Sequence, residues 1–147
     1  LGFLDSLDAL PPHLDSIQDF FGGWEGNSGN PGYSSSVKAV FNMAGALKSK
    51  TYIDQDDTPL INFHGVDDDV VPYECGNVYS GLVGNFDVVK MCGSLAIHNR
   101  CLERGVETTL YSYPGKHVPW MNSDTGEPLP LFDEIEEKII TFLYEHL

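Results

Sequence analysis

The chain has 147 residues, and its 22 acidic side chains outnumber 8 basic ones, which gives a formal net charge of −14 at pH 7. This length suits one domain, and no apolar run approaches the ~20 residues of a membrane-spanning helix. The charge argues against binding to nucleic acid or to anionic membrane surfaces, because both attract lysine and arginine.

The N-terminal quarter of the chain predicts a short helix and a long loop. Residues 1–8 have the pattern of a helix end, and the chain does not begin with Met. We therefore expect a processed product, a designed fragment or the product of a truncated reading frame. Apolar residues at helical spacing predict a helix over 13–21 that Gly22 and Gly23 close. Residues 22–36 are rich in Gly, Asn, Ser and Pro and predict a loop.

Three segments predict the strands of a sheet. They span residues 37–43, 59–63 and 106–113. The first two are short apolar runs, which are typical of buried strands. The connection at 51–58 is polar. Residues 70–88 fit no regular period, so we expect them to be irregular.

Two helices complete the pattern. Leu95, Asn99 and Leu102 share one face of a predicted helix over 93–104, and Gly105 is placed to end it in the left-handed conformation. A final amphipathic helix is marked by a second set of apolar residues at helical spacing: Phe132, Ile135, Ile139, Phe142 and Leu143. The order strand, strand, helix, strand, helix predicts an α/β fold, a mostly parallel sheet with flanking helices.

The three cysteines leave two interpretations open. Cys75 and Cys92 lie where they could meet, and a disulfide between them would fit an exported protein. The alternative is three reduced, partly buried thiols, with Cys101 in the middle of a helix. The spacing of the three matches no zinc-binding pattern.

An acid and a histidine follow two of the predicted strands. Asp68 lies just past the second strand, and His117, 49 residues later, lies just past the third. Because parallel strands end at the same edge of a sheet, we expect the two loops to face each other there. A carboxylate that accepts a hydrogen bond from an imidazole Nδ1 fixes the tautomer in which Nε2 takes up a proton. Asp68 and His117 are therefore the candidate catalytic residues.

The sequence around this pair resembles a known family. The stretch HGVDDDVVP at 64–72 is similar to the acid loop of α/β-hydrolase esterases, and YPGKHVPW at 113–120 is similar to their histidine loop. GNSGNPGY at 26–33 resembles the segment that leads into the sixth strand of their sheet. The overall likeness is to bacterial carboxylesterase/lipase-like proteins, many of them exported, and it covers the C-terminal half of their domain. Position in the motif favours Asp68 over Asp67 and Asp69, which we interpret as surface residues or loop caps.

The chain departs from the family in one respect. It contains no Gly-x-Ser-x-Gly nucleophile turn. The resemblance implies that the nucleophile and the oxyanion hole lie upstream of residue 1, and that 1–5 corresponds to the end of the helix after the nucleophile. The chain's own candidate serines are poor substitutes: Ser28, Ser34, Ser35, Ser36 and Ser94. Ser94 begins a predicted helix but follows no apolar strand.

The resemblance implies a function. Residues 1–147 would form a partial α/β-hydrolase domain, with its acid loop at about 64–73 and its histidine loop at about 113–120. It would be part of a serine ester hydrolase for small carboxylic esters, inactive by itself. One alternative is a non-catalytic fragment of the same fold that persists by self-association, and another is a peptidase of the same fold. We expect no cofactor and no metal.

Further expectations concern partners and single residues. A sheet cut next to residues 37–43 would expose a strand edge, which favours a homo-oligomer or association with the missing N-terminal half. The family likeness suggests an exported, periplasmic or secreted protein. We expect His64 to support the acid loop by hydrogen bonding. Trp120 either lines the active crevice or covers the core.

Overall fold

The computed structural model describes residues 33, 34, 36–78 and 89–147. The chain divides into two units, Leu1–Val37 and Lys38–Leu147, and every helix and strand discussed below belongs to the second. The predicted helix over 13–21 and the family-like segment 26–33, except for its last residue, lie outside the described residues.

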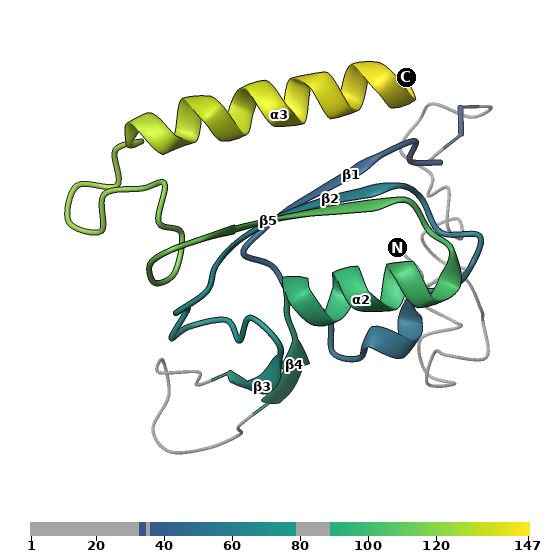
Figure 1. Ribbon diagram of the computed structural model, residues 1–147, viewed down its shortest axis with the longest axis horizontal. Helices are drawn as coiled ribbons and strands as arrows, with labels where there is room; N and C mark the ends of the chain where they lie inside the picture. Colours follow the sequence, from purple (N-terminus) through teal and green to yellow (C-terminus); the bar gives the residue numbers. More distant parts are fainter. Residues whose placement is uncertain (1–32, 35, 79–88) are drawn as a thin grey trace. The chain divides into compact units, whose positions relative to one another are not determined.

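A parallel sheet of three strands forms the centre of the second unit. It consists of β1 (Val40–Met43), β2 (Leu60–Gly65) and β5 (Thr108–Tyr113) in the order β1-β2-β5, as Figure 1 shows. These are the three strands that the sequence predicted, with ends shifted by up to three residues. The parallel pairing confirms the α/β class.

The two faces of β2 carry different side chains, because residues of a strand alternate between its faces. Ile61 and Phe63 are buried in one apolar cluster with Ile135 and Phe142 of α3 (Pro130–His146). Helix α3 thus covers this face, and α2 covers the other in Figure 1. Asn62 and His64, which alternate with these apolar residues along β2, are polar and fully buried.

Helix α2 (Ser94–Arg104) ends where the sequence predicted. Gly105 has φ 75°, in the left-handed region, and its N–H bonds to the carbonyl oxygens of Cys101 and Leu102. Ile97 and Cys101 of this helix pack with Ile53 and Val106 in a second apolar cluster. A short 3-10 helix, η2 (Lys50–Tyr52), lies in the connection between β1 and β2.

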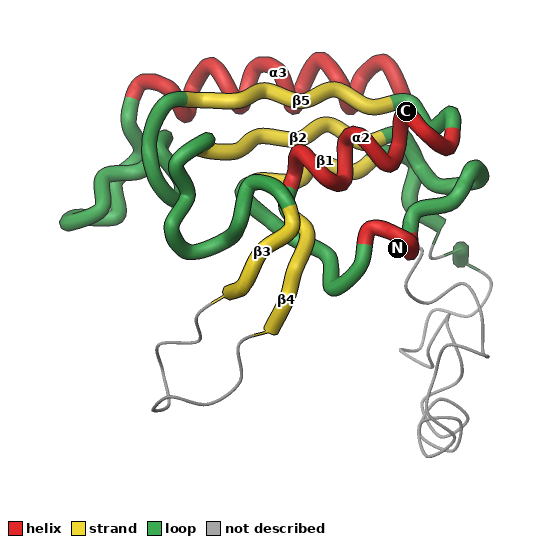
Figure 2. Tube along the Cα trace, turned by 60° about the horizontal axis from the view of Figure 1, so that its bottom comes forward, coloured by secondary structure: helices red, strands yellow, loops and turns green. Residues whose placement is uncertain are grey.

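The expectation that residues 70–88 are irregular is wrong at Cys75–Val78. These residues form β3, which pairs antiparallel with β4 (Val89–Cys92), and the hairpin projects from the sheet in Figure 2. A disulfide joins Cys75 to Cys92, directly opposite each other in the register. The sequence CGNV has no strand-like apolar alternation, so its conformation depends on β4 and the crosslink rather than on its own pattern. Cys101 is a buried free thiol.

Strand β1 lies at an edge of the sheet. Among the described residues it pairs with β2 alone, and Phe41 keeps 48% of its surface exposed.

In the part of the chain that the structure describes, neither α2 nor α3 has the length and apolar character needed to cross a membrane.

Candidate functional site

The acid loop after β2 and the histidine loop after β5 are joined along their backbones. The last pair of the β2–β5 register is Gly65 with Tyr113, so both loops begin at the same point of the sheet edge. The N–H of Val66 donates to the Tyr113 carbonyl (2.9 Å), and the N–H of Asp67 donates to Gly115 (3.0 Å). The two loops therefore leave the sheet as a connected pair.

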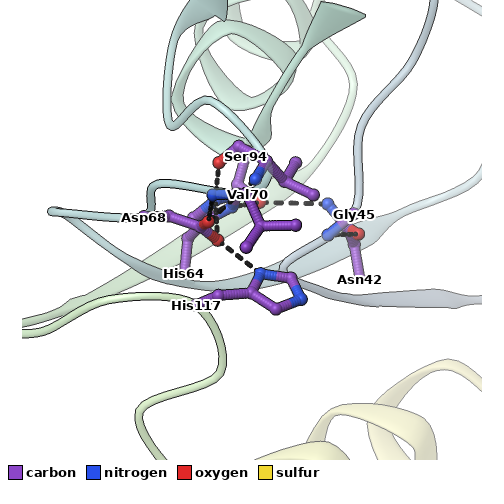
Figure 3. A network of polar contacts seen from close by, with 8 residues as sticks. Asn42, Gly45, His64, Asp68, Val70, Ser94 and His117 are labelled. Carbon is purple, nitrogen blue, oxygen red and sulfur yellow. Dashed lines mark hydrogen bonds and ion pairs between the residues drawn. The ribbon is translucent and has the colours of Figure 1, made fainter. Parts of the chain in front are cut away.

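Asp68 and His117 meet in this pair of loops. The Nδ1 of His117 lies 2.8 Å from Oδ2 of Asp68, and Figure 3 shows the two side chains pointing toward each other. Oδ1 of the same carboxylate accepts the backbone N–H groups of Val70 and Val71, both at 2.8 Å. The Asp68 side chain is fully buried, whereas the His117 side chain is 33% exposed. The acid is thus enclosed, and the histidine reaches the surface.

The environment of Asp68 favours its charged form. Burial by itself would raise the pKa of this carboxyl group, but the hydrogen bonds from His117, Val71 and Val70 outweigh burial and lower it. Asp68 is therefore a carboxylate at neutral pH. Its hydrogen bond to Nδ1 leaves Nε2 of His117 without a partner among the described residues.

The backbone after His117 is held in an uncommon conformation. Val118 has φ 46°, in the left-handed region that β-branched residues rarely adopt. Its side chain packs against the apolar cluster under α3, and its carbonyl accepts the N–H of Met121 (2.9 Å). Packing thus holds this strained residue beside the candidate histidine, where strain of this kind often marks a functional site.

Two neighbours of Asp68 have surface positions, as the sequence predicted. Asp69 forms an exposed ion pair with Lys116 (2.7 Å), which lowers the pKa of Asp69. Asp67 is exposed. Asp68 is therefore the member of the three that faces His117.

The side chain of His64, on β2, contacts the carboxylate of Asp68. The fully buried His64 ring places Nε2 3.2 Å from Oδ2 of Asp68 and 3.2 Å from the carbonyl oxygen of Val71. Its Nδ1 lies 2.7 Å from Oγ of Ser94. The hydrogen bonding expected between His64 and the acid loop is present.

The structure changes the interpretation of Ser94. Strand β4 ends at Cys92, Gly93 precedes the helix, and Ser94 is the first residue of α2. The local sequence of strand, turn and helix, which we did not expect, is thus present. Ser94 is nonetheless fully buried, so its hydroxyl cannot reach a substrate.

Asn42 is a site residue that the sequence analysis missed. Its Nδ2 lies 3.0 Å from Oδ1 of Asn62 and 3.1 Å from Oγ of Ser94, which connects β1 to β2 and α2. A signal was present, since Asn42 and Asn62 interrupt two apolar strands, and buried polar side chains need partners.

Trp120 covers the core rather than a crevice. It is 2% exposed and belongs to the apolar cluster that contains Phe63 and Ile135. Its ring packs edge-to-face on Tyr113, with 6.4 Å between centroids.

A separate hollow lies on the α3 face of the sheet. It has a volume of about 360 Å³, and its walls include Ile61, Tyr111, Glu134 and Lys138. Neither Asp68 nor His117 lines it, so it does not belong to the Asp–His site. Within the described parts of the chain, no group of three or more His, Cys, Asp and Glu side chains is arranged to hold a metal ion.

Comparison of the chain with protein-family models, with curated proteins and with solved structures found no match. The reaction that this chain could support is therefore inferred from the Asp68–His117 site. A buried carboxylate bound to Nδ1 of a surface imidazole is an arrangement for general base and acid catalysis at Nε2.

Proposed function

We propose that the chain supplies the acid, Asp68, and the histidine, His117, of a Ser-His-Asp triad in an α/β-hydrolase that cleaves small carboxylic esters. The nucleophilic serine and the oxyanion hole belong to sequence outside this chain. The observation that carries the proposal is the 2.8 Å contact between His117 Nδ1 and the buried Asp68 carboxylate. The order of acid and histidine, and the motifs around them, add support.

In the proposed reaction, the serine hydroxyl gives its proton to Nε2 of His117 while its oxygen attacks the ester carbonyl carbon. Asp68 stabilises the resulting imidazolium through Nδ1. The imidazolium then gives its proton to the departing alcohol. A water molecule then gives its proton to Nε2 of His117 and attacks the acyl-serine. The imidazolium returns the proton to the serine oxygen, which releases the carboxylic acid and restores the serine.

The test joins the chain to the sequence that precedes residue 1 in its gene and measures hydrolysis of p-nitrophenyl acetate and butyrate. We expect turnover by the longer protein, and a loss in kcat of about 10⁶-fold for His117→Ala and of about 10⁴-fold for Asp68→Asn. His98→Gln is the matched control, because His98 lies on α2 and bonds Thr108 (3.2 Å) away from the site. Activity that survives His117→Ala would exclude the proposal.

Two further measurements separate this proposal from its alternatives. The purified 147-residue chain should show no turnover and no labelling by a fluorophosphonate probe, because the nucleophile is elsewhere. Turnover by the chain alone would contradict the assignment of the serine to other sequence. A panel of peptide substrates tests for a peptidase of the same fold, since the Asp–His geometry serves both reactions.

The disulfide supports a location for this proposed enzyme. Disulfides form and persist in oxidising compartments such as the bacterial periplasm or the cell exterior, and Cys75 is bonded to Cys92. An exported hydrolase fits this chemistry. Fractionation of cells that express the full gene, with immunodetection, would find it outside the cytoplasm.

A second candidate function, self-association, rests on the edge of β1. A strand edge with an exposed aromatic residue invites pairing with another chain. Among the described residues β1 pairs with β2 alone, and Phe41 is 48% exposed there. Sedimentation at micromolar concentration should give a dimer or larger species, and Phe41→Lys should give a monomer. Tyr144→Lys is the control, because Tyr144 is 82% exposed on α3. A monomeric parent chain would contradict this candidate.

A further inference from the structure

Polar side chains form a directed series of hydrogen bonds that runs from β1 to Asp68. It passes by hydrogen bonds from Asn42 to Ser94 and from Ser94 to His64, and its last step is the 3.2 Å ion-pair contact between His64 Nε2 and the carboxylate that binds His117 (Figure 3). Each step joins a different element of the fold. The direction of every bond can be derived from groups that only donate or only accept.

The orientation of the Asn42 amide is fixed at the start of the series. The backbone N–H of Gly45 donates to Oδ1 of Asn42 (3.0 Å), and a backbone N–H can only donate. The other end of the amide, Nδ2, is therefore the donor to Ser94. The contact needs glycine, because a Cβ atom on Gly45 would overlap Oδ1 of Asn42.

The donor from Asn42 determines how Ser94 bonds to His64. Because Oγ of Ser94 accepts from Asn42 Nδ2 (3.1 Å), its own hydrogen is available for Nδ1 of His64 at 2.7 Å. Nδ1 then accepts, so the proton of the neutral ring is on Nε2.

The other end of His64 leads to the same tautomer independently. Nε2 faces the Asp68 carboxylate and the Val71 carbonyl oxygen, both at 3.2 Å, and both groups can only accept. Burial also lowers the pKa of His64, which agrees with a neutral ring. His64 thus accepts from Ser94 at Nδ1, and its Nε2–H donates to the Val71 carbonyl oxygen in contact with the Asp68 carboxylate.

We propose that His64, with Ser94 and Asn42 behind it, is a positioning residue that aims Oδ2 of Asp68 at His117. The inference rests on the proposed function, because it concerns the Asp–His pair of that reaction. Oδ2 accepts from His117 Nδ1 and contacts Nε2 of His64, and Oδ1 accepts from the amides of Val70 and Val71. Donors on both oxygens prevent the carboxylate from rotating away from His117.

The first test uses ¹⁵N and ¹H NMR of the 147-residue chain to determine which nitrogens of the His64 and His117 rings carry a proton. We expect His64 to carry its proton on Nε2 and His117 to carry one on Nδ1 that exchanges slowly with water. In His64→Leu and Ser94→Ala, exchange of the His117 Nδ1 proton should accelerate at least tenfold. His64→Gln should restore slow exchange, because a Gln side chain can accept from Ser94 and donate to Asp68. His98→Leu is the control and should leave His117 unchanged.

Two outcomes would overturn the proposal. One is a His64 ring with its proton on Nδ1, because the series would then run the other way. The other is a variant that loses stability but keeps the His117 proton signal unchanged, because the network would then serve packing alone. Ser94→Ala removes one hydroxyl and keeps the test decisive if His64→Leu does not fold.

The second test uses the longer protein and p-nitrophenyl butyrate. His64→Leu should lower kcat by about 10- to 100-fold, as misplaced catalytic groups do, with KM unchanged, and His64→Gln should recover most of it. Equal activity in His64→Leu and the parent would overturn the positioning role. If the longer protein has no esterase activity while the NMR results hold, the proposed function fails and the series of hydrogen bonds stands.

Discussion

Gly65 and Lys116 meet backbone to backbone, so that a Cβ atom on Gly65 would overlap the carbonyl oxygen of Lys116. Gly65 is the last residue of β2, and Lys116 directly precedes His117. The contact brings the acid loop and the histidine loop together more closely than any other residue would allow. It sets the separation at which Asp68 reaches His117.

Gly65→Ala should therefore separate the loops. We expect it to cost about 1–3 kcal/mol of unfolding free energy, as overpacking of a buried site does, and to weaken the Asp68–His117 bond. Urea denaturation gives the first quantity, and NMR of the His117 Nδ1 proton reports the second. Gly105→Ala is the control. Its cost of about 1–2 kcal/mol comes from a left-handed φ of 75° with no neighbour in the way, so His117 should not change. Identical spectra for the parent and Gly65→Ala would contradict this argument.

Much of the fold followed from local patterns in the sequence. Strand β2 lies on a short apolar run, and Gly105 ends α2 because glycine adopts the left-handed conformation without steric cost. The closeness of Asp68 and His117 follows from one topological rule, that parallel neighbours end at the same edge. These features depend on properties that each segment carries by itself.

The remaining features depend on contacts between distant segments. Ser94 bonds Asn42 across 52 residues, and no period in the sequence connects them. Strand β3 forms against β4 and a disulfide, while its own residues have little strand preference. The two roles left open for Trp120 differed only in what packs around it. Sequence patterns locate each segment, but the partner of a buried polar or aromatic side chain becomes known only from the assembled fold.

The disulfide should contribute to stability. Cys75 and Cys92 are 17 residues apart, and closing a loop of that size reduces the entropy of the unfolded chain and so raises its free energy by about 3 kcal/mol. Denaturation with and without a phosphine reductant measures the difference. The double variant Cys75→Ser/Cys92→Ser should be as stable as the reduced protein, and its stability should not change when the reductant is added. A parent chain that is equally stable with and without reductant would contradict a structural role for the bond.

The third cysteine should be unreactive in the folded chain. Cys101 is 1% exposed, and burial raises the pKa of its thiol. Reagents therefore reach the sulfur poorly, and little of it is in the reactive thiolate form. Without reductant, Ellman's reagent should detect one thiol per chain in denaturant, and it should react far more slowly under native conditions. Three thiols in denaturant would show that Cys75 and Cys92 are reduced.

His64 should make the fold sensitive to mild acid. Burial lowers its pKa in the folded chain, whereas the unfolded ring titrates near ~6.5. The stability that the neutral ring contributes is thus fully present above that pH, and it is lost as the pH falls from there towards the lowered folded value. Urea midpoints should fall less between pH 7 and 5 in His64→Gln than in the parent. Since burial also lowers the pKa of His98, His98→Gln is measured alongside to separate the two histidines. A parent midpoint that does not change over this range would contradict the prediction.

His146 should have the opposite pH dependence. Its Nδ1 lies 2.7 Å from the carbonyl oxygen of Phe142, and its Nε2 lies 3.2 Å from Oε1 of Glu107. The hydrogen bond to Phe142 and the pairing with Glu107 raise the pKa of His146. Its contribution is therefore fully present below the unfolded pKa of ~6.5 and is lost as the pH rises through the raised folded value. His146→Gln should lower the urea midpoint more at pH 5.5 than at pH 8.5, and Glu107→Gln should remove part of that difference. Equal losses at both pH values would show that the charged ring adds nothing to the attachment of α3.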